Sequence, residues 1–210
     1  MICNDKSCFS PETIKRLTVY LQNFKRLKKN NVEIVSSGEI SKLLNVSPEQ
    51  FRKDLSYFGE FGKRGVGYST TTMVDELEGI LGLDKKWTVA LVGVGKLGSS
   101  LLNYPGFSEL NVKFTAAFDS DKKKHGKIIN NVEVHDVIHF KKIIKKRKIK
   151  ICVICIPVEN VQEVADMVVD SGIQAILNFA PIVLNVPEKI YVSNMDIYSE
   201  IERLIYYLNK

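Results

Sequence analysis

The sequence predicts an α/β protein in which an N-terminal winged helix-turn-helix domain precedes a Rossmann-like domain with a parallel sheet and a C-terminal helix. Two observations support this prediction. Residues 10–82 contain short amphipathic helices and a glycine-rich segment, whereas from Trp87 onward apolar strands alternate with amphipathic helices. The second pattern is typical of a parallel sheet that helices cover on both faces. A chain of 210 residues is long enough for two such domains.

The composition excludes a disordered chain, because 45% of the residues are hydrophobic and 26% are charged. The longest apolar run, residues 151–158, is far shorter than the roughly 20 residues of a membrane helix, and the first residues lack a secretory signal. We therefore expect a cytoplasmic protein without a membrane span. The net charge is +6, and residues 1–70 hold 12 Lys and Arg against 7 Asp and Glu. This excess indicates a polyanionic partner for the N-terminal part.

Four cysteines are too few for a disulfide framework in a chain of this length. Cys152 and Cys155 have the spacing of a metal or redox pair, but they lie in an apolar stretch that predicts a buried strand. An odd spacing points the two thiols to opposite faces of a strand, so we expect core packing and no metal site. Cys3 and Cys8 lie in an N-terminal tail without matching ligands.

Three helices are predicted before the glycine-rich segment. Ser10 and Pro11 provide a cap and a first residue for a long helix whose apolar positions recur at helical spacing. A capping box at Ser36 and Glu39 starts a short second helix, and Ser47 followed by Pro48 starts a third. Two short helices joined by a tight turn indicate a helix-turn-helix.

The segment 59–68 has four glycines and the adjacent cations Lys63 and Arg64, which suits a hairpin or wing and not a helix. Thr72 is expected to start a fourth helix, which Gly82 ends. The first domain is therefore expected to span residues 1–82, with a linker at 83–86.

The second domain is expected to span residues 87–195. Its strands are predicted at 88–93, 112–118, 132–135, 149–156, 173–177 and 190–193, and its helices near 96–103, 137–147 and 159–171. Residues 196–210 are expected to form a separate C-terminal helix, from about 196 to 208. That helix has one apolar stripe, formed by Ile197, Ile201, Leu204, Ile205 and Leu208.

A glycine loop from Gly93 to Gly98 follows the first of these strands and leads into a helix. Such glycines permit a tight turn, close approach of the backbone to a pyrophosphate and close helix packing. Asp119 ends the second strand, 21 residues after Gly98, where a carboxylate would bond a ribose 2′-hydroxyl and repel a 2′-phosphate. The pattern favours NAD(H) over NADP(H), although three lysines at 122–124 leave the opposite choice open. A tight turn without a ligand is the plain alternative.

The third helix presents polar residues away from its apolar face, and these suit base edges and phosphates in DNA. The wing cations suit a neighbouring minor groove. An ordinary solvated helix would have a similar composition. The residues predicted to contact DNA are Ser47, Gln50, Arg52, Lys53, Ser56, Tyr57, Lys63, Arg64 and Gly65.

A catalytic base is not evident from the sequence. His125, His135 and His139 lie in or beside the lysine-rich part after the second strand, and we expect them at the surface, away from a cofactor. We therefore predict a DNA-binding sensor without catalytic residues. An NAD-dependent dehydrogenase with an accessory N-terminal domain is the alternative, and a sensor of another nucleotide such as CoA is a third interpretation.

Several motifs together resemble the Rex family of redox-sensing transcriptional repressors. The resemblance covers residues 10–208 and depends on segments 52–68, 93–98, 104–107, 117–119, 176–181 and 194–196. It implies a homodimer that exchanges its final helix with the partner chain and reads a palindromic operator in double-stranded DNA. It also implies that NADH closes the dimer and releases DNA, whereas NAD⁺ competes for the same site.

The resemblance extends to individual residues. The residues predicted to contact NADH or NAD⁺ are Gly93, Val94, Gly95, Lys96, Leu97, Gly98, Asp119, Ile156, Pro157, Asn178, Ala180 and Pro181. Asp196 is implied to pair with Arg16 in one state and with Tyr104 in the other. From the residues alone, Asp196 is interpreted as a helix cap, Arg16 as a solvated cation and Tyr104 as a packed aromatic residue. The chain departs from many relatives at Thr18, Gln22, Lys96 and Ile197.

Overall fold

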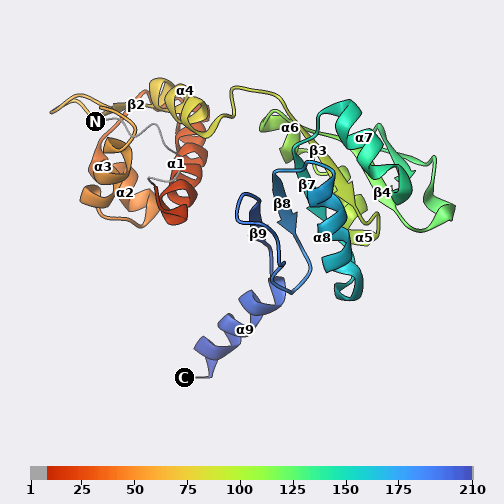
Figure 1. Cartoon of the computed structure of the whole chain (residues 1–210). Coiled ribbons are helices and arrows are strands. Elements are labelled where there is room, and N and C mark those ends of the chain that lie inside the picture. The colour runs from red at the N-terminus through yellow and green to blue at the C-terminus, as the bar shows by residue number, and fades with distance from the viewer. Residues whose placement is uncertain (1–8, 210) are drawn as a thin grey trace. The chain divides into compact units, whose positions relative to one another are not determined.

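A computed structural model describes residues 9–209, so Cys3, Cys8 and Lys210 lie outside the described residues. The chain divides into two compact units, one that ends at Lys85 and one that begins at Lys86. Figure 1 shows the helices of the first unit in red to yellow and the sheet of the second in green to blue.

From residue 9 onward, the N-terminal unit has four helices and a two-stranded antiparallel sheet. Its elements are α1 (Pro11–Lys29), β1 (Ile34–Val35), α2 (Ser37–Leu44), α3 (Pro48–Ser56), β2 (Tyr68–Ser69) and α4 (Thr70–Leu81). Ser10 and Ser47 cap α1 and α3, and the capping box of Ser36 and Glu39 is complete. These predicted helix starts are confirmed.

The predicted start of α4 is wrong by three residues. Ser69 is the cap, and its hydroxyl accepts a hydrogen bond from the Thr72 backbone N–H. Thr72 is therefore the third helical residue and not the cap. The helix ends as expected at Gly82, whose φ of 69° is a left-handed conformation that suits glycine.

The glycine-rich segment forms the expected hairpin. Lys63 and Gly67 pair in an antiparallel bridge, directly before β2 pairs with β1. Gly67 has a φ of 114°, and a Cβ atom there would lie 2.7 Å from the Val35 carbonyl oxygen. Backbone conformation and lack of space both require glycine at this position.

The C-terminal unit is built on a seven-stranded sheet in the order β5-β6-β4-β3-β7-β8-β9. Only the pair β5–β6 is antiparallel. The strands are β3 (Trp87–Val92), β4 (Val112–Asp119), β5 (Ile128–Ile129), β6 (Val132–Asp136), β7 (Ile151–Ile154), β8 (Ala175–Asn178) and β9 (Tyr191–Asn194). The order without β5 is that of a doubly wound dinucleotide-binding sheet. All six predicted strands are present, and β5 is an addition too short to give a pattern.

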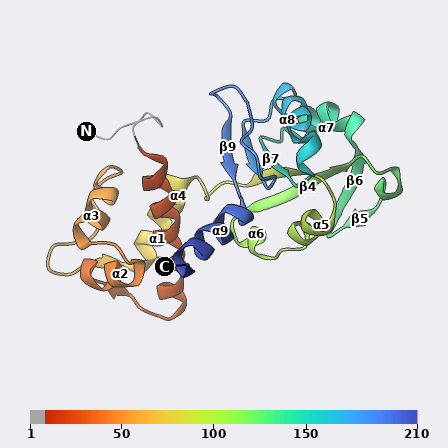
Figure 2. The same ribbon diagram turned by 90° about the horizontal axis from the view of Figure 1, so that it is seen from below.

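Helices cover both faces of the sheet, as Figure 2 shows. One face, with Ala90 and Val92, packs against α7 (Phe140–Arg147) and α8 (Val161–Asp170). The other face, with Val89 and Leu91, packs against α5 (Lys96–Leu102), with Phe107 of α6 (Gly106–Glu109) at its border. The predicted helices at 137–147 and 159–171 each begin with a 3₁₀ turn, at 137–139 and 158–160.

The last helix, α9 (Ile197–Leu208), stands apart from this core. Asp196 caps it, and all twelve helical residues are exposed, including the predicted apolar stripe from Ile197 to Leu208. Isolated helices of this length are marginal in water, and uncovered apolar stripes mark interaction surfaces. Among the described residues, no helix is both long and apolar enough to cross a membrane.

Gly98→Ala tests the packing of the glycine loop. A Cβ atom at Gly98 would overlap the Gly93 carbonyl oxygen. We expect the variant to lose about 1–3 kcal/mol of unfolding free energy. Urea denaturation can follow the fluorescence of Trp87, the single tryptophan of the chain, in the C-terminal unit. The control is Gly95→Ala, because a Cβ atom there meets nothing within 4 Å; equal losses in both variants would contradict the packing argument.

Candidate functional site

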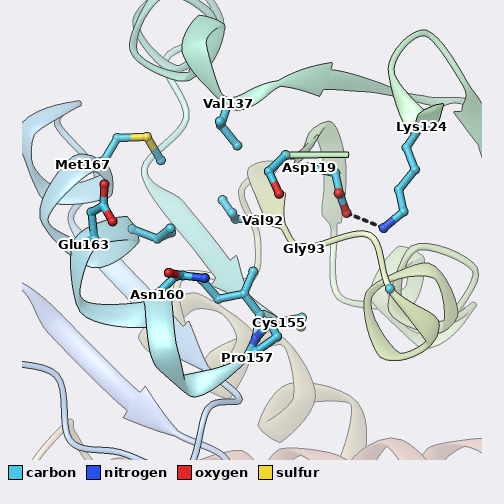
Figure 3. Close-up of a pocket in the computed structure, with 14 residues that line it drawn as sticks. Val92, Gly93, Asp119, Lys124, Val137, Cys155, Pro157, Asn160, Glu163 and Met167 are labelled. Carbon is cyan, nitrogen blue, oxygen red and sulfur yellow. Dashed lines mark hydrogen bonds and ion pairs between the residues drawn. The ribbon is translucent and has the colours of Figure 1, made fainter. Parts of the chain in front are cut away.

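The main pocket of the C-terminal unit lies at the carboxyl ends of β3, β4 and β7, where parallel sheets of this order bind ligands. Its volume is about 600 Å³, within the range of small-molecule sites. Residues of both predicted motifs meet there (Figure 3). The lining residues are Val92, Gly93, Gly95, Asp119, Ser120, Lys124, Val137, Cys155, Ile156, Pro157, Asn160, Glu163, Val164 and Met167.

The three loop glycines have three different roles. Gly93 has a φ of 95°, and a Cβ atom there would overlap the Cys155 carbonyl oxygen, so this glycine allows the turn against β7. Gly98 lets α5 pack onto the loop backbone. Space above Gly95 is open, and α5 begins there without a side-chain cap on its first amide groups. The first amide groups of α5 therefore have no side-chain partner at the place where a phosphate could approach.

Asp119 is buried, with 7% of its surface exposed, and both oxygens of its carboxylate accept hydrogen bonds. Oδ2 accepts hydrogen bonds of 2.8 Å from the Val94 backbone N–H and from Lys124 Nζ, and Oδ1 accepts one of 2.9 Å from the Asp121 N–H. Burial alone would raise the pKa of Asp119, but these bonds outweigh it and lower the pKa. Asp119 therefore stays ionised and fastens the glycine loop to β4.

The cation closest to this carboxylate is already paired. Figure 3 shows Lys124 reaching the Asp119 carboxylate at the pocket wall. The neighbouring Lys122 and Lys123 are exposed. Lys124 is therefore not a free cation for a 2′-phosphate, which supports the prediction that the pocket favours NAD(H).

The expected surface position of the histidines is wrong for two of the three. His125 Nε2 lies 2.8 Å from the Asp119 carbonyl oxygen, at the carboxyl end of β4, and the ring is mostly buried. His135 belongs to β6 opposite Phe118, and burial lowers its pKa. Only His139 is exposed. None of the three lines the pocket.

Other predicted cofactor residues lie elsewhere in the unit. Asn178 is buried and donates from Nδ2 to the carbonyl oxygens of Ala180 and Ile182 and to Asn194 Oδ1. Asn178 and Ala180 thus fasten the turn after β8 to β9, and Pro181 is exposed beside them. Val94 is buried, whereas Lys96 and Leu97 are exposed on α5. Of these six residues, none lines the pocket, and their contact with a cofactor stays a prediction.

One wall of the pocket was not predicted from the sequence. Asn160, Glu163, Val164 and Met167 come from the start of α8 and the turn before it. These residues form no motif, because helical spacing identifies a buried face but not the sheet edge that it covers. Cys152 is buried in the core on one face of the sheet, and Cys155 packs partly buried against the core on the other face, as expected, while it also lines the pocket. Burial raises the pKa of the Cys155 thiol to about 12.

The predicted DNA-contacting residues of the N-terminal unit lie on α3, at its two ends and on the wing. Arg52, Lys53 and Ser56 are exposed on α3, and Tyr57 follows them half-exposed. Ser47 caps α3. A hollow of about 480 Å³ lies between the helices and the wing and is lined by Ser36, Ser37, Arg52, Lys63, Arg64, Gly65 and other wing residues. It brings one cation of α3 together with both cations of the wing.

Gln50 differs from these exposed residues, because its amide is bound to a buried carboxylate. Gln50 Nε2 donates to Asp54 Oδ1 at 2.7 Å. Asp54 is 0% exposed and also accepts from Tyr20 and from two nitrogens of Arg16. Burial alone would raise the pKa of Asp54, but the bonds from Arg16, Tyr20 and Gln50 hold it below its ordinary value.

The three predicted switch residues each have local partners. Arg16 pairs with Asp54 within its own unit, at 2.6 Å from Nε to Oδ2. Tyr104 is 61% exposed and packs edge-on against Phe107. Asp196 accepts from the backbone N–H groups of Tyr198 and Ser199 as the cap of α9. A pairing of Asp196 with Arg16 or Tyr104 stays a prediction.

A cation-bearing winged helix followed by a doubly wound domain with a dinucleotide-type glycine loop defines a ligand-responsive DNA-binding regulator. Within residues 9–209, no cluster of His, Cys, Asp and Glu could hold a metal ion.

Comparisons with known proteins place this regulator in a family. Residues 10–56 match the model "Putative DNA-binding protein N-terminus" and residues 84–182 the model "CoA binding domain". The chain is 41% identical over 205 residues to the redox-sensing transcriptional repressor Rex of Chloroflexus aurantiacus, covering 97% of each chain. It is 44% identical over 196 residues to the protein of the same name from Pelotomaculum thermopropionicum, covering 93% of this chain and 92% of the relative. The chain belongs to the Rex family of redox-sensing transcriptional repressors.

Solved structures agree with this membership. A crystal structure of RSP in complex with β-NAD⁺ and operator DNA matches with a TM-score of 0.94 and 37% identity, over 97% of this chain and 94% of that one. RSP in complex with β-NADH matches with a TM-score of 0.89 and 36% identity, over 97% and 96% of the two chains.

Because Asp54 is buried and ionised, we expect the stability of the N-terminal unit to depend on pH in the acid range. Its folded-state pKa is lowered, so its stabilising contribution is complete above the ordinary carboxyl pKa of about 4 and is lost as the pH falls through the lower folded-state value. We expect Asp54→Asn to be less stable than the unchanged protein at pH 6, and the difference to shrink below about pH 4. Hydrogen exchange of the α1 and α3 amides at a series of pH values measures this difference in stability. A difference that does not change with pH would contradict the lowered pKa of Asp54 in the folded protein.

Proposed function

We propose that this chain is a repressor that binds operator DNA through its N-terminal unit and leaves the DNA when NADH occupies the glycine-loop pocket. The observation that carries the proposal is the open space over Gly95 beside an ionised Asp119, in a chain whose other unit gathers cations on α3 and the wing. The relatives named as redox-sensing repressors support it. We also propose that the protein acts in the cytoplasm, where it would meet both operator DNA and NADH.

The residues of the pocket fit a dinucleotide. The loop amides around Gly95 would hold the pyrophosphate, and Asp119 lies where a ribose would be bound. Val92, Val137 and Ile156 give the pocket apolar surface for a flat ring. NADH would act as a ligand whose binding energy shifts a conformational equilibrium, so no residue needs to move a proton. We therefore propose a regulator and not an enzyme; steady hydride transfer to or from a small alcohol or aldehyde would instead indicate a dehydrogenase.

We propose that the working form is a homodimer in which α9 packs against the partner chain. The exposed apolar stripe of α9, with Ile201 and Ile205 each 51% exposed, supports this arrangement, because its own unit leaves the stripe uncovered. A twofold dimer presents two α3 helices and reads two half-sites, which is why a palindromic operator is expected. Lys53 would contact phosphates, the wing cations would reach a neighbouring minor groove, and Arg52 and Ser56 would reach base edges.

The proposed switch uses Asp196, Arg16 and Tyr104. Asp196 would pair with Arg16 in one of the two states and with Tyr104 in the other, and NADH and DNA would favour different states. A coupling free energy of about 1–3 kcal/mol changes affinity roughly 5- to 150-fold, which is within the reach of one or two rearranged polar contacts. In this scheme, Arg16 would have to divide its guanidinium between Asp54 and Asp196.

Release from DNA by NADH is the first test. In a mobility-shift titration, we expect micromolar to millimolar NADH to dissociate the complex, and NAD⁺ to compete with it. Gly95→Ala places a methyl group in the space for the pyrophosphate, so NADH should bind at least about tenfold more weakly, about 1.4 kcal/mol, while DNA binding is kept.

Calorimetry with NADH, NADPH and CoA completes this test, because one of the matching family models is described as a CoA-binding domain. DNA binding that is indifferent to NADH but responds to CoA would reject the proposed ligand.

Asp196→Ala tests the switch. We expect the variant to bind NADH within about tenfold of the unchanged protein, ~1.4 kcal/mol, but to stay on DNA when NADH is added. Asp196→Asn is the matched control, since asparagine caps a helix as well as aspartate but has no charge. Both variants should be uncoupled, as judged by mobility shift with and without NADH. Normal release in Asp196→Asn would show that Asp196 acts only as a cap.

A further inference from the structure

The polar centre of the N-terminal unit is the Asp54 carboxylate, where α3 meets α1. Oδ2 accepts from Arg16 Nε at 2.6 Å and from the Tyr20 hydroxyl at 2.7 Å. Oδ1 accepts from Arg16 Nη2 and from Gln50 Nε2, both at 2.7 Å. Four donors therefore converge on one carboxylate that is 0% exposed. Three come from α1, and the fourth is Gln50, one turn before Asp54 on α3.

The charge of Asp54 fixes which way the Gln50 amide points. An ionised carboxylate only accepts hydrogen bonds, so the NH₂ group of Gln50 must face it. The amide keeps its oxygen and a second N–H for other partners. Those two groups are the pair with which glutamine reads N6 and N7 of adenine in the major groove. Gln50 is the third residue of α3, and the N-terminal residues of a recognition helix contact base edges.

We propose that Asp54 is a positioning residue for sequence recognition, which holds the Gln50 amide in the orientation that reads an A·T pair. This inference rests on the proposed DNA-binding function and names a specificity determinant within it. Arg16 and Tyr20 keep the buried carboxylate ionised and in place. Holding the amide in advance removes the cost of ordering a flexible glutamine at the moment of binding.

A purely structural role for Asp54 predicts something different. If the network only ties α1 to α3, its loss weakens the fold and lowers affinity for every DNA sequence alike. A positioning role predicts that one base pair of the operator loses its preference. The sequence preference at each base pair separates the two roles.

The experiment uses the full-length protein and an operator enriched from a random DNA pool without NADH. Each base pair of the enriched operator is then changed, and binding is measured for four proteins: the unchanged chain, Gln50→Ala, Asp54→Asn and the double variant. Gln50→Ala should lose roughly 5- to 150-fold of discrimination at one A·T pair. Asp54→Asn should lose discrimination at that same pair, and the double variant should lose no more than Gln50→Ala.

Lys53→Ala is the matched control from the same helix, because the Lys53 side chain is exposed, whereas Asp54 is buried. It should weaken binding to all sequences and reduce the salt slope by about 1, with preferences unchanged. Unchanged discrimination in Gln50→Ala, or a uniform loss in Asp54→Asn, would overturn the positioning role. Enrichment of no sequence at all would overturn the DNA-binding function on which the inference rests.

Asp54→Asn can fail to fold, so a second measurement uses the unchanged protein. The side-chain amide of Gln50, assigned in ¹⁵N spectra by its disappearance in Gln50→Ala, should exchange slowly with solvent while Asp54 is ionised. Amide protons that exchange as fast as those of an exposed glutamine would overturn the proposal without any variant of Asp54.

Discussion

The ligand pocket depends on the requirement that a buried carboxylate be hydrogen-bonded. Asp119 cannot lie at the end of β4 as a charge without partners, because an unpaired buried charge costs several kcal/mol. Its partners are the Val94 N–H of the glycine loop, the Asp121 N–H and the Lys124 ammonium. Of these bonds, the one from Val94 fixes the glycine loop beside β4. This fixed loop in turn leaves open the space over Gly95 that a pyrophosphate requires.

The N-terminal unit also contains a buried carboxylate whose oxygens are hydrogen-bonded. Asp54 is buried between α1 and α3, and Arg16, Tyr20 and Gln50 satisfy it together. In both units an aspartate at a junction of two elements sets the orientation of a functional segment. The difference lies in what is oriented: a backbone loop in one unit and a side-chain amide in the other.

The helix α9 carries apolar surface that its own unit leaves exposed to solvent. Its apolar stripe from Ile197 to Leu208 is exposed along its whole length, although the sheet and the winged unit bury their own apolar residues well. A second copy of the chain would cover this surface and complete the helix packing, which is why the proposed sensing mechanism needs the dimer. A ligand that alters how two chains pack can alter the spacing of two recognition helices without touching DNA.

The sequence by itself determined the order of the elements, the helix caps at Ser10, Ser36 and Ser47, the glycine loop and Asp119 at the end of β4, because each depends on local spacing and on the backbone preferences of single residues. It did not determine the α8 wall with Glu163 and Met167, the half-buried position of His125, or the partner of Arg16. Those depend on which distant segments meet, and helical or strand periodicity identifies a buried face without identifying what covers it. Only the tertiary structure brought Arg16 to Asp54, which Gln50 already faces across one turn of α3, since a contact between α1 and α3 across 38 residues leaves no periodic trace in the chain.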